Sequence, residues 1–176
     1  MSEKGAKCQT VKYEPNNNDV LSNKSDKKID KISMKDCSLP EGMIKKFQAK
    51  HQNPKKERWA IEFNYGEKDP PQFVAYFTEQ AAKNFVEEVN RSFTESKCKP
   101  AGFRPTADSV LCNLSDNEIG YISMSDRHMP GDEHLGEKNR WAIEFEYGGS
   151  QFVAYFTEEA AKIFKEKVNE SFNKST

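Results

Sequence analysis

The sequence predicts an α+β fold made of two tandem β-β-β-β-α repeats. The first observation is an internal duplication, in which 36 of 53 aligned positions are identical. The second is a change of hydrophobic period within each copy, from two to about 3.6, as expected where strands are followed by a helix. We therefore expect each copy to form an antiparallel sheet covered by its own C-terminal helix, and the two copies to pack as a pseudo-twofold unit.

The duplication aligns in three blocks whose offset changes along the chain. The first copy has eight extra residues before Trp59 and three more in its next hairpin, and insertions of this kind fall in loops. We expect a disordered N-terminal tail, two copies and a linker. These are the tail at 1–18, the first copy at 19–95 with a basic insert at 41–57, the linker at 96–108 and the second copy at 109–173.

Alternation of apolar and polar residues predicts the strands. Residues 59–65 and 141–147 have this period, and the aromatic runs at 73–77 and 152–156 predict the next strand of each copy. Further strands are expected at 19–23 and 29–34, and at 109–113 and 119–124. Thr78 and Thr157 occupy helix N-cap positions, and each precedes apolar residues at helical spacing. Those residues are Ala82, Phe85, Val89 and Phe93 in the first copy, and Ala161, Phe164, Val168 and Phe172 in the second.

Composition argues against several classes of protein. The net charge is −1, but residues 1–58 carry +6 and the remainder −7, a pattern typical of a basic arm beside an acidic body. The four cysteines form no C-x-x-C pair and do not repeat between copies, which favours free thiols in a reducing compartment. Without a leader or an apolar stretch long enough to span a bilayer, we expect a cytoplasmic protein that does not engage membranes.

The predicted order of elements resembles that of the PUR-repeat proteins and, more distantly, the Whirly-type proteins. The residues that carry the resemblance are Tyr121 to Met124, Asn139 to Tyr147 and Gln151 to Phe172. The resemblance implies binding of single-stranded nucleic acid on exposed strand faces that are rich in basic and aromatic residues. The positions beside Trp59 and Trp141 depart from such faces, because they include Glu62 and Glu144.

No motif in the sequence indicates catalysis. His51, His128 and His134 are not repeated, and no nucleophile elbow, P-loop or dinucleotide-binding turn is present. Cys112 with His128 and His134 matches no standard zinc spacing. We therefore expect no catalytic residue, no metal site and no cofactor.

Two binding functions stay open at this point. One is binding of single-stranded nucleic acid, and the other is a regulatory role that depends on a partner protein; a homodimer is compatible with either. Trp59 and Trp141 are expected in the core, whereas Tyr76 and Tyr155 alternate away from the phenylalanine face and are expected on the surface. The candidate ligand-binding residues are Lys45, Lys46, Lys50, Lys55, Lys56, Arg58, Arg140, Tyr76 and Tyr155.

Overall fold

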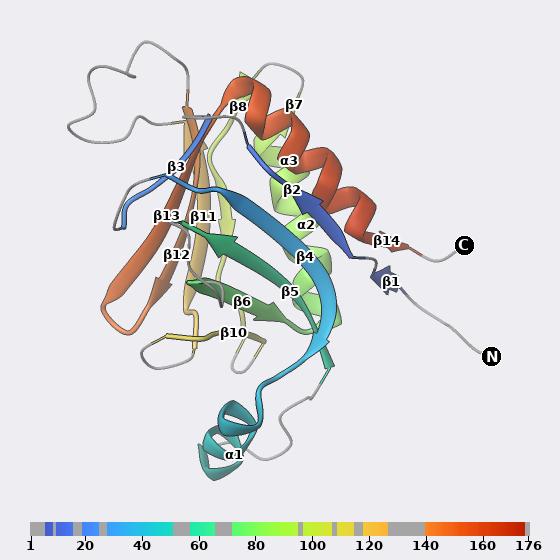
Figure 1. The fold of residues 1–176 in the computed structure, drawn as a ribbon, viewed down its shortest axis with the longest axis vertical. Coiled ribbons are helices and arrows are strands. Elements are labelled where there is room, and N and C mark those ends of the chain that lie inside the picture. The colour runs from blue at the N-terminus through green and yellow to red at the C-terminus, as the bar shows by residue number, and fades with distance from the viewer. Residues whose placement is uncertain are drawn as a thin grey trace.

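The chain forms an α+β fold with two five-stranded antiparallel sheets and three helices, and strands make up most of the regular structure of the described residues (Figure 1). Two short two-stranded ribbons complete it. The computed structural model describes residues 6–8, 10–15, 19–24, 28–50, 57–65, 72–94, 97–106, 109–114, 118–126 and 140–174.

The two large sheets have equivalent strand orders, β10-β6-β5-β4-β2 and β3-β13-β12-β11-β9. The first consists of β10 (Val110–Cys112), β6 (Phe73–Phe77), β5 (Glu57–Asn64), β4 (Lys31–Ser38) and β2 (Val11–Tyr13). The second consists of β3 (Val20–Ser22), β13 (Ser150–Thr157), β12 (Arg140–Tyr147), β11 (Tyr121–Asp126) and β9 (Ala101–Phe103). The ribbons pair β1 (Ala6–Cys8) with β14 (Phe172–Lys174), and β7 (Phe93–Thr94) with β8 (Lys97–Cys98).

Each large sheet contains one strand from the other copy, so the expectation of two self-contained sheets was wrong. Strand β10 of the second copy pairs with β6, and β3 of the first copy pairs with β13. The same residue type secures both pairings. The Asn113 side chain accepts a hydrogen bond from the Val74 amide at 3.0 Å, and the Asn23 side chain accepts one from Val153 at 2.9 Å. Neither sheet is therefore complete without the other copy.

Four strands lie where the sequence predicted neither strand nor helix, and two of them, β1 and β8, belong to the short ribbons. Strands β1 and β2 fall in the expected tail, and β8 and β9 in the expected linker. Of these, β2 and β9 form the edges of the large sheets, beside β4 and β11. The Tyr13 ring is buried in the common core, and this burial raises the pKa of its phenol to about 12. Three-residue strands give too short a pattern to be recognised, and their pairing partners supply the missing order.

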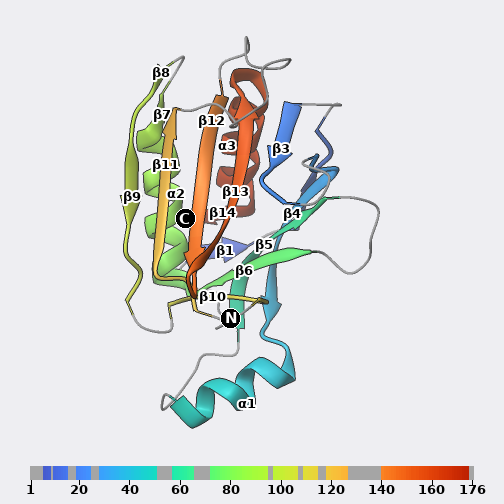
Figure 2. The same cartoon turned by 90° about the vertical axis from the view of Figure 1, so that its left-hand side faces the viewer.

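The helices are α1 (Glu41–Lys50), α2 (Glu79–Ser92) and α3 (Glu158–Ser171). The two predicted N-caps are confirmed, because the Thr78 and Thr157 hydroxyls accept from the amides of Ala81 and Ala160 at 3.2 Å. Helices α2 and α3 lie on the same side of the sheets (Figures 1 and 2). α2 contacts β9 and β11 besides β5 and β6, and α3 contacts β2 and β4 besides β12 and β13. Each helix thus covers parts of both sheets, not only its own.

One apolar core joins the two copies, and both tryptophans lie in it as predicted. The indole of Trp59 donates to the Ser171 hydroxyl at 2.8 Å, and the indole of Trp141 donates to Ser92 at 2.7 Å. Each bond crosses from one copy to the end of the other copy's helix. Phe73 and Phe152 stack near the centre with ring centroids 4.3 Å apart. The interior is therefore shared and nearly symmetric, which leaves the outer sheet faces as the place for functional differences.

Candidate functional site

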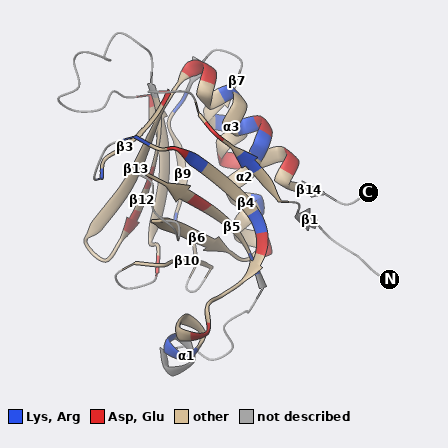
Figure 3. Cartoon of the chain, viewed as in Figure 1, with Lys and Arg blue, Asp and Glu red and all other residues tan. Residues whose placement is uncertain are grey.

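Three lysines lie on the outer face of the first sheet, and we call this set the lysine face: Lys12, Lys31 and Lys35. They alternate along β2 and β4 with Tyr13, Ile32 and Met34, which point into the core. The register sets Lys12 opposite Ser33, the residue between the other two lysines. The three lysines therefore lie around Ser33 on one face of the sheet, with Lys31 and Lys35 two residues to either side of it. Figure 3 shows the basic positions on these strands in blue.

Two carboxylates accompany this face, Glu62 on β5 and the exposed Glu14, which follows β2 two residues after Lys12. Lys35 pairs with Glu62 on β5 at 3.1 Å, with side chains 39% and 15% exposed. A partly exposed pair of this kind contributes little to stability. Against three ammonium groups, these two carboxylates leave the face with a net positive charge.

The second sheet does not repeat the lysine face. At the equivalent positions it has Gly102, Tyr121 and Ser125 in place of the three lysines, whereas Glu144 matches Glu62. Packing explains the glycine at position 102, because a Cβ there would lie 2.7 Å from the Ile122 carbonyl oxygen. The two copies therefore share strand register on their outer faces but not charge.

The basic insert forms α1, which packs on the outer face of the first sheet through its apolar residues. Leu39 and Met43 join Val74, Tyr76 and Leu111 in a separate cluster. Lys45 and Lys46 lie on the exposed side of this helix. Lys50 ends α1 and Arg140 begins β12, but neither side chain is described, and Lys55 and Lys56 lie outside the described residues.

Three of the predicted ligand-binding residues are buried, which corrects their placement on the surface. Arg58 is only 2% exposed and donates to the Ser109 carbonyl oxygen at 3.1 Å. Tyr76 and Tyr155 do point away from the phenylalanine face, but they are 8% and 4% exposed. Tyr76 lies in the cluster formed with α1, and Tyr155 packs with Leu21, Ala142 and Val153. The predicted site is therefore not assembled as one surface.

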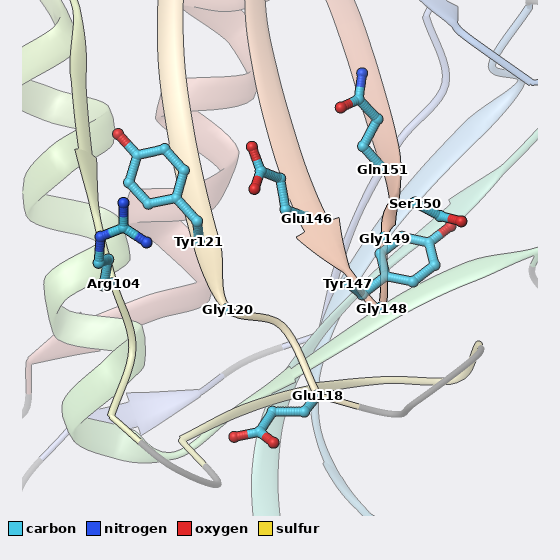
Figure 4. A pocket seen from close by; sticks show the side chains of 10 residues that line it. All are labelled: Arg104, Glu118, Gly120, Tyr121, Glu146, Tyr147, Gly148, Gly149, Ser150 and Gln151. Atoms are coloured by element: carbon cyan, nitrogen blue, oxygen red, sulfur yellow. The ribbon is translucent and has the colours of Figure 1, made fainter.

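Sequence reasoning missed a pocket of about 520 Å³ on the second copy (Figure 4). It lies where the β12–β13 hairpin meets the start of β11. A row of four side chains runs along it, and we call this the pocket row: Arg104, Tyr121, Glu146 and Gln151. Strand register aligns Tyr121 with Glu146 and Glu146 with Gln151, and Arg104 continues the row just after β9. Glu118 and the hairpin glycines complete the lining.

The pocket row combines a flat surface with hydrogen-bond acceptors. The Arg104 guanidinium lies over the Tyr121 ring, 4.7 Å from its centroid, in a cation–π arrangement. Glu146 and Glu118 supply carboxylates, and Gln151 supplies an amide. The excess of carboxylates over guanidinium makes this pocket unfavourable for phosphate and favourable for N–H donors.

Cys37, beside the lysine face on β4, is not suited to act as a nucleophile. Burial raises the pKa of its thiol to about 11, although nearby Lys35 acts in the opposite direction. The thiol is therefore protonated at neutral pH, and the thiolate is the reactive form. Within the described part of the chain, acidic, histidine and cysteine side chains form no group of three that could hold a metal ion. His51, His128 and His134 lie outside the described residues.

None of the helices in the described residues has the length and apolar character to cross a bilayer.

Similarity to known proteins supplies no further guide to the site. No family model matches the chain, and neither a curated protein nor a solved structure matches it significantly.

Proposed function

We propose that this chain is a non-enzymatic protein that binds single-stranded nucleic acid through the lysine face of its first sheet. The observation that carries the proposal is the grouping of Lys12, Lys31 and Lys35 on one outer face, where they outnumber the two acidic residues. Several ammonium groups on one sheet face favour a polyanion, because each phosphate contact releases condensed counterions.

An open sheet face fits a single strand better than a duplex. Duplex recognition commonly places a helix or a β-ribbon in the major groove, whereas single strands lie on sheets with their bases stacked on aromatic rings. Tyr121 offers such a ring on the second sheet and is only partly buried. Lys45 and Lys46 on α1 add positive charge at the border of the first sheet.

We further propose that the two copies are a tandem duplication of a β-β-β-β-α unit that folds as a covalent pseudo-dimer. The reciprocal exchange of β3 and β10 supports this, and so do the crossed Trp59–Ser171 and Trp141–Ser92 hydrogen bonds. In such an arrangement one outer face is free to bind phosphates while the other diverges.

A partner protein is the second candidate. The described sheets end in the three-residue strands β2, β10, β3 and β9, and sheet edges are places where an extended peptide adds. Binding through edge backbone groups depends weakly on salt, so salt dependence separates the two candidates.

The proposal is tested by fluorescence anisotropy with a labelled thymidine oligonucleotide of about 15 nucleotides, titrated at several salt concentrations. We expect the triple variant K12Q/K31Q/K35Q to bind more weakly and to reduce the slope of log affinity against log salt by roughly 2, at about 0.7 per phosphate contact.

The matched control is K83Q/K162Q/K167Q, which removes the same charge from α2 and α3. It should keep most of the salt slope. The proposal is wrong if the wild-type protein does not bind the oligonucleotide at low salt, or if both triple variants lose the same part of the slope.

A further inference from the structure

We infer that the pocket row of the second copy is a nucleobase subsite, which prefers a base with adjacent N–H donors, guanine, over thymine or uracil. This inference rests on the proposed function and deepens it. It assigns reading of the base to Arg104, Tyr121, Glu146 and Gln151, and leaves the phosphates to the lysine face.

The pairing register of the strands places the residues of the pocket row side by side. Tyr121, Glu146 and Gln151 lie opposite one another on β11, β12 and β13, on the face away from the core. The β12–β13 hairpin closes at Gly148 and Gly149, which adopt φ of 52° and 80° and add no side chain to the rim. Figure 4 shows the four side chains along the pocket, with Glu118 on the segment below. A planar ligand can therefore approach the row closely.

The Arg104–Tyr121 pair supplies the stacking surface. Its guanidinium and ring are held 4.7 Å apart, so the pair forms a layered platform before any ligand arrives. Bases stack on aromatic rings and on guanidinium planes alike. Stacking alone tolerates every base, so discrimination must come from the polar neighbours.

Glu146 supplies the discrimination. An ionised carboxylate only accepts hydrogen bonds, through two oxygens that suit a pair of adjacent donors. The Watson–Crick edge of guanine carries N1–H beside the N2 amino group, whereas thymine and uracil present one N–H between two carbonyl oxygens. The Gln151 amide can donate to guanine O6, because it lies opposite Glu146 in the row. Glu118 adds acceptor oxygens at the lower rim.

The first copy shows what the row is like without these features. At the equivalent positions it has Glu14, Lys31, Asn64 and Gln72, with neither an aromatic ring nor the strand carboxylate. Its hairpin is also three residues longer. The two rows therefore differ in ligand chemistry although their strand positions agree.

The experiment compares three thymidine oligonucleotides that differ at one central position: thymine, guanine or hypoxanthine, which lacks the N2 amino group. With the wild-type protein we expect guanine to bind about tenfold tighter than thymine, within the range of one bidentate contact, and hypoxanthine to fall between them. E146Q should bring the guanine preference close to one without changing the salt slope. E146N, which uses the first copy's residue, should do the same.

E144Q is the matched control, since it removes a carboxylate from the same face of β12 two residues away. It should keep the guanine preference. Equal binding of all three oligonucleotides by the wild-type protein would overturn the subsite and leave the proposed function standing. Loss of the preference in E144Q as well as E146Q would also overturn it. Absence of any oligonucleotide binding would refute both proposals.

Discussion

On the first sheet, the row at the hairpin end carries Glu14, Lys31, Asn64 and Gln72, and on the second the same row carries Arg104, Tyr121, Glu146 and Gln151. One glutamine is common to both. Beneath these rows the inner faces are almost identical, with Trp59, Phe63 and Phe73 matched by Trp141, Phe145 and Phe152. The comparison shows that a duplicated unit keeps the residues by which its copies pack together and diverges where its faces meet solvent.

The inner faces should respond equally to mutation, and this is the largest effect we expect. Phe73→Ala and Phe152→Ala should each lower the free energy of unfolding by about 3–5 kcal/mol, because each leaves a cavity in the shared core. Urea denaturation followed by circular dichroism measures both. The double variant should lose less than the sum, since the rings stack at 4.3 Å. A large effect in one copy with none in the other would contradict the shared core.

Mutations at equivalent positions on the two outer faces should change stability by different amounts. The larger of these changes should be smaller than the loss caused by the core mutations. Gly102→Ala should destabilise the protein by about 1–3 kcal/mol, because the new Cβ would lie 2.7 Å from the Ile122 carbonyl oxygen and force β9 away from β11. The control is Lys12→Ala at the equivalent position on β2, where the side chain is already exposed. Thermal denaturation compares the two variants. Equal melting temperatures would show that the glycine is not required there.

The smallest effect concerns the outer face beneath α1. Burial, with smaller contributions from Cys37 and Glu62, raises the pKa of Tyr76 from 10 to about 12. A folded pKa above the unfolded value means that this contribution to stability is complete below pH 10 and is lost as the pH rises towards 12. Tyr76→Phe should make the loss of stability between pH 10 and 12 shallower, as measured by urea denaturation across this range. Tyr13 and Tyr147, with pKa values also raised to about 12, maintain part of the decline. An unchanged alkaline decline in the variant would show that α1 does not shield the Tyr76 phenol.

The candidate site illustrates the limit of prediction from pattern. Alternation correctly separated Tyr76 and Tyr155 from the phenylalanine face, but it does not say what covers the opposite face. Arg58 was predicted to bind the ligand because it lies beside the basic insert, yet it is buried and a carbonyl of the other copy, at Ser109, accepts its hydrogen bond. The pocket row carries no motif, because its members come from three separate segments: the end of β9, the start of β11 and the β12–β13 hairpin.

By itself, the sequence determined the duplication, the α+β class, the strands around both tryptophans and the two capped helices, because these follow from local periodicity and from side chains that act on neighbouring backbone groups. The tertiary structure alone decided which strands pair, so that β3 and β10 exchange between copies and β2 and β9 gain order at the sheet edges. The physical reason is that a backbone hydrogen bond between strands carries no sequence code. Partner choice depends on burying both inner faces at once, which only the assembled chain achieves.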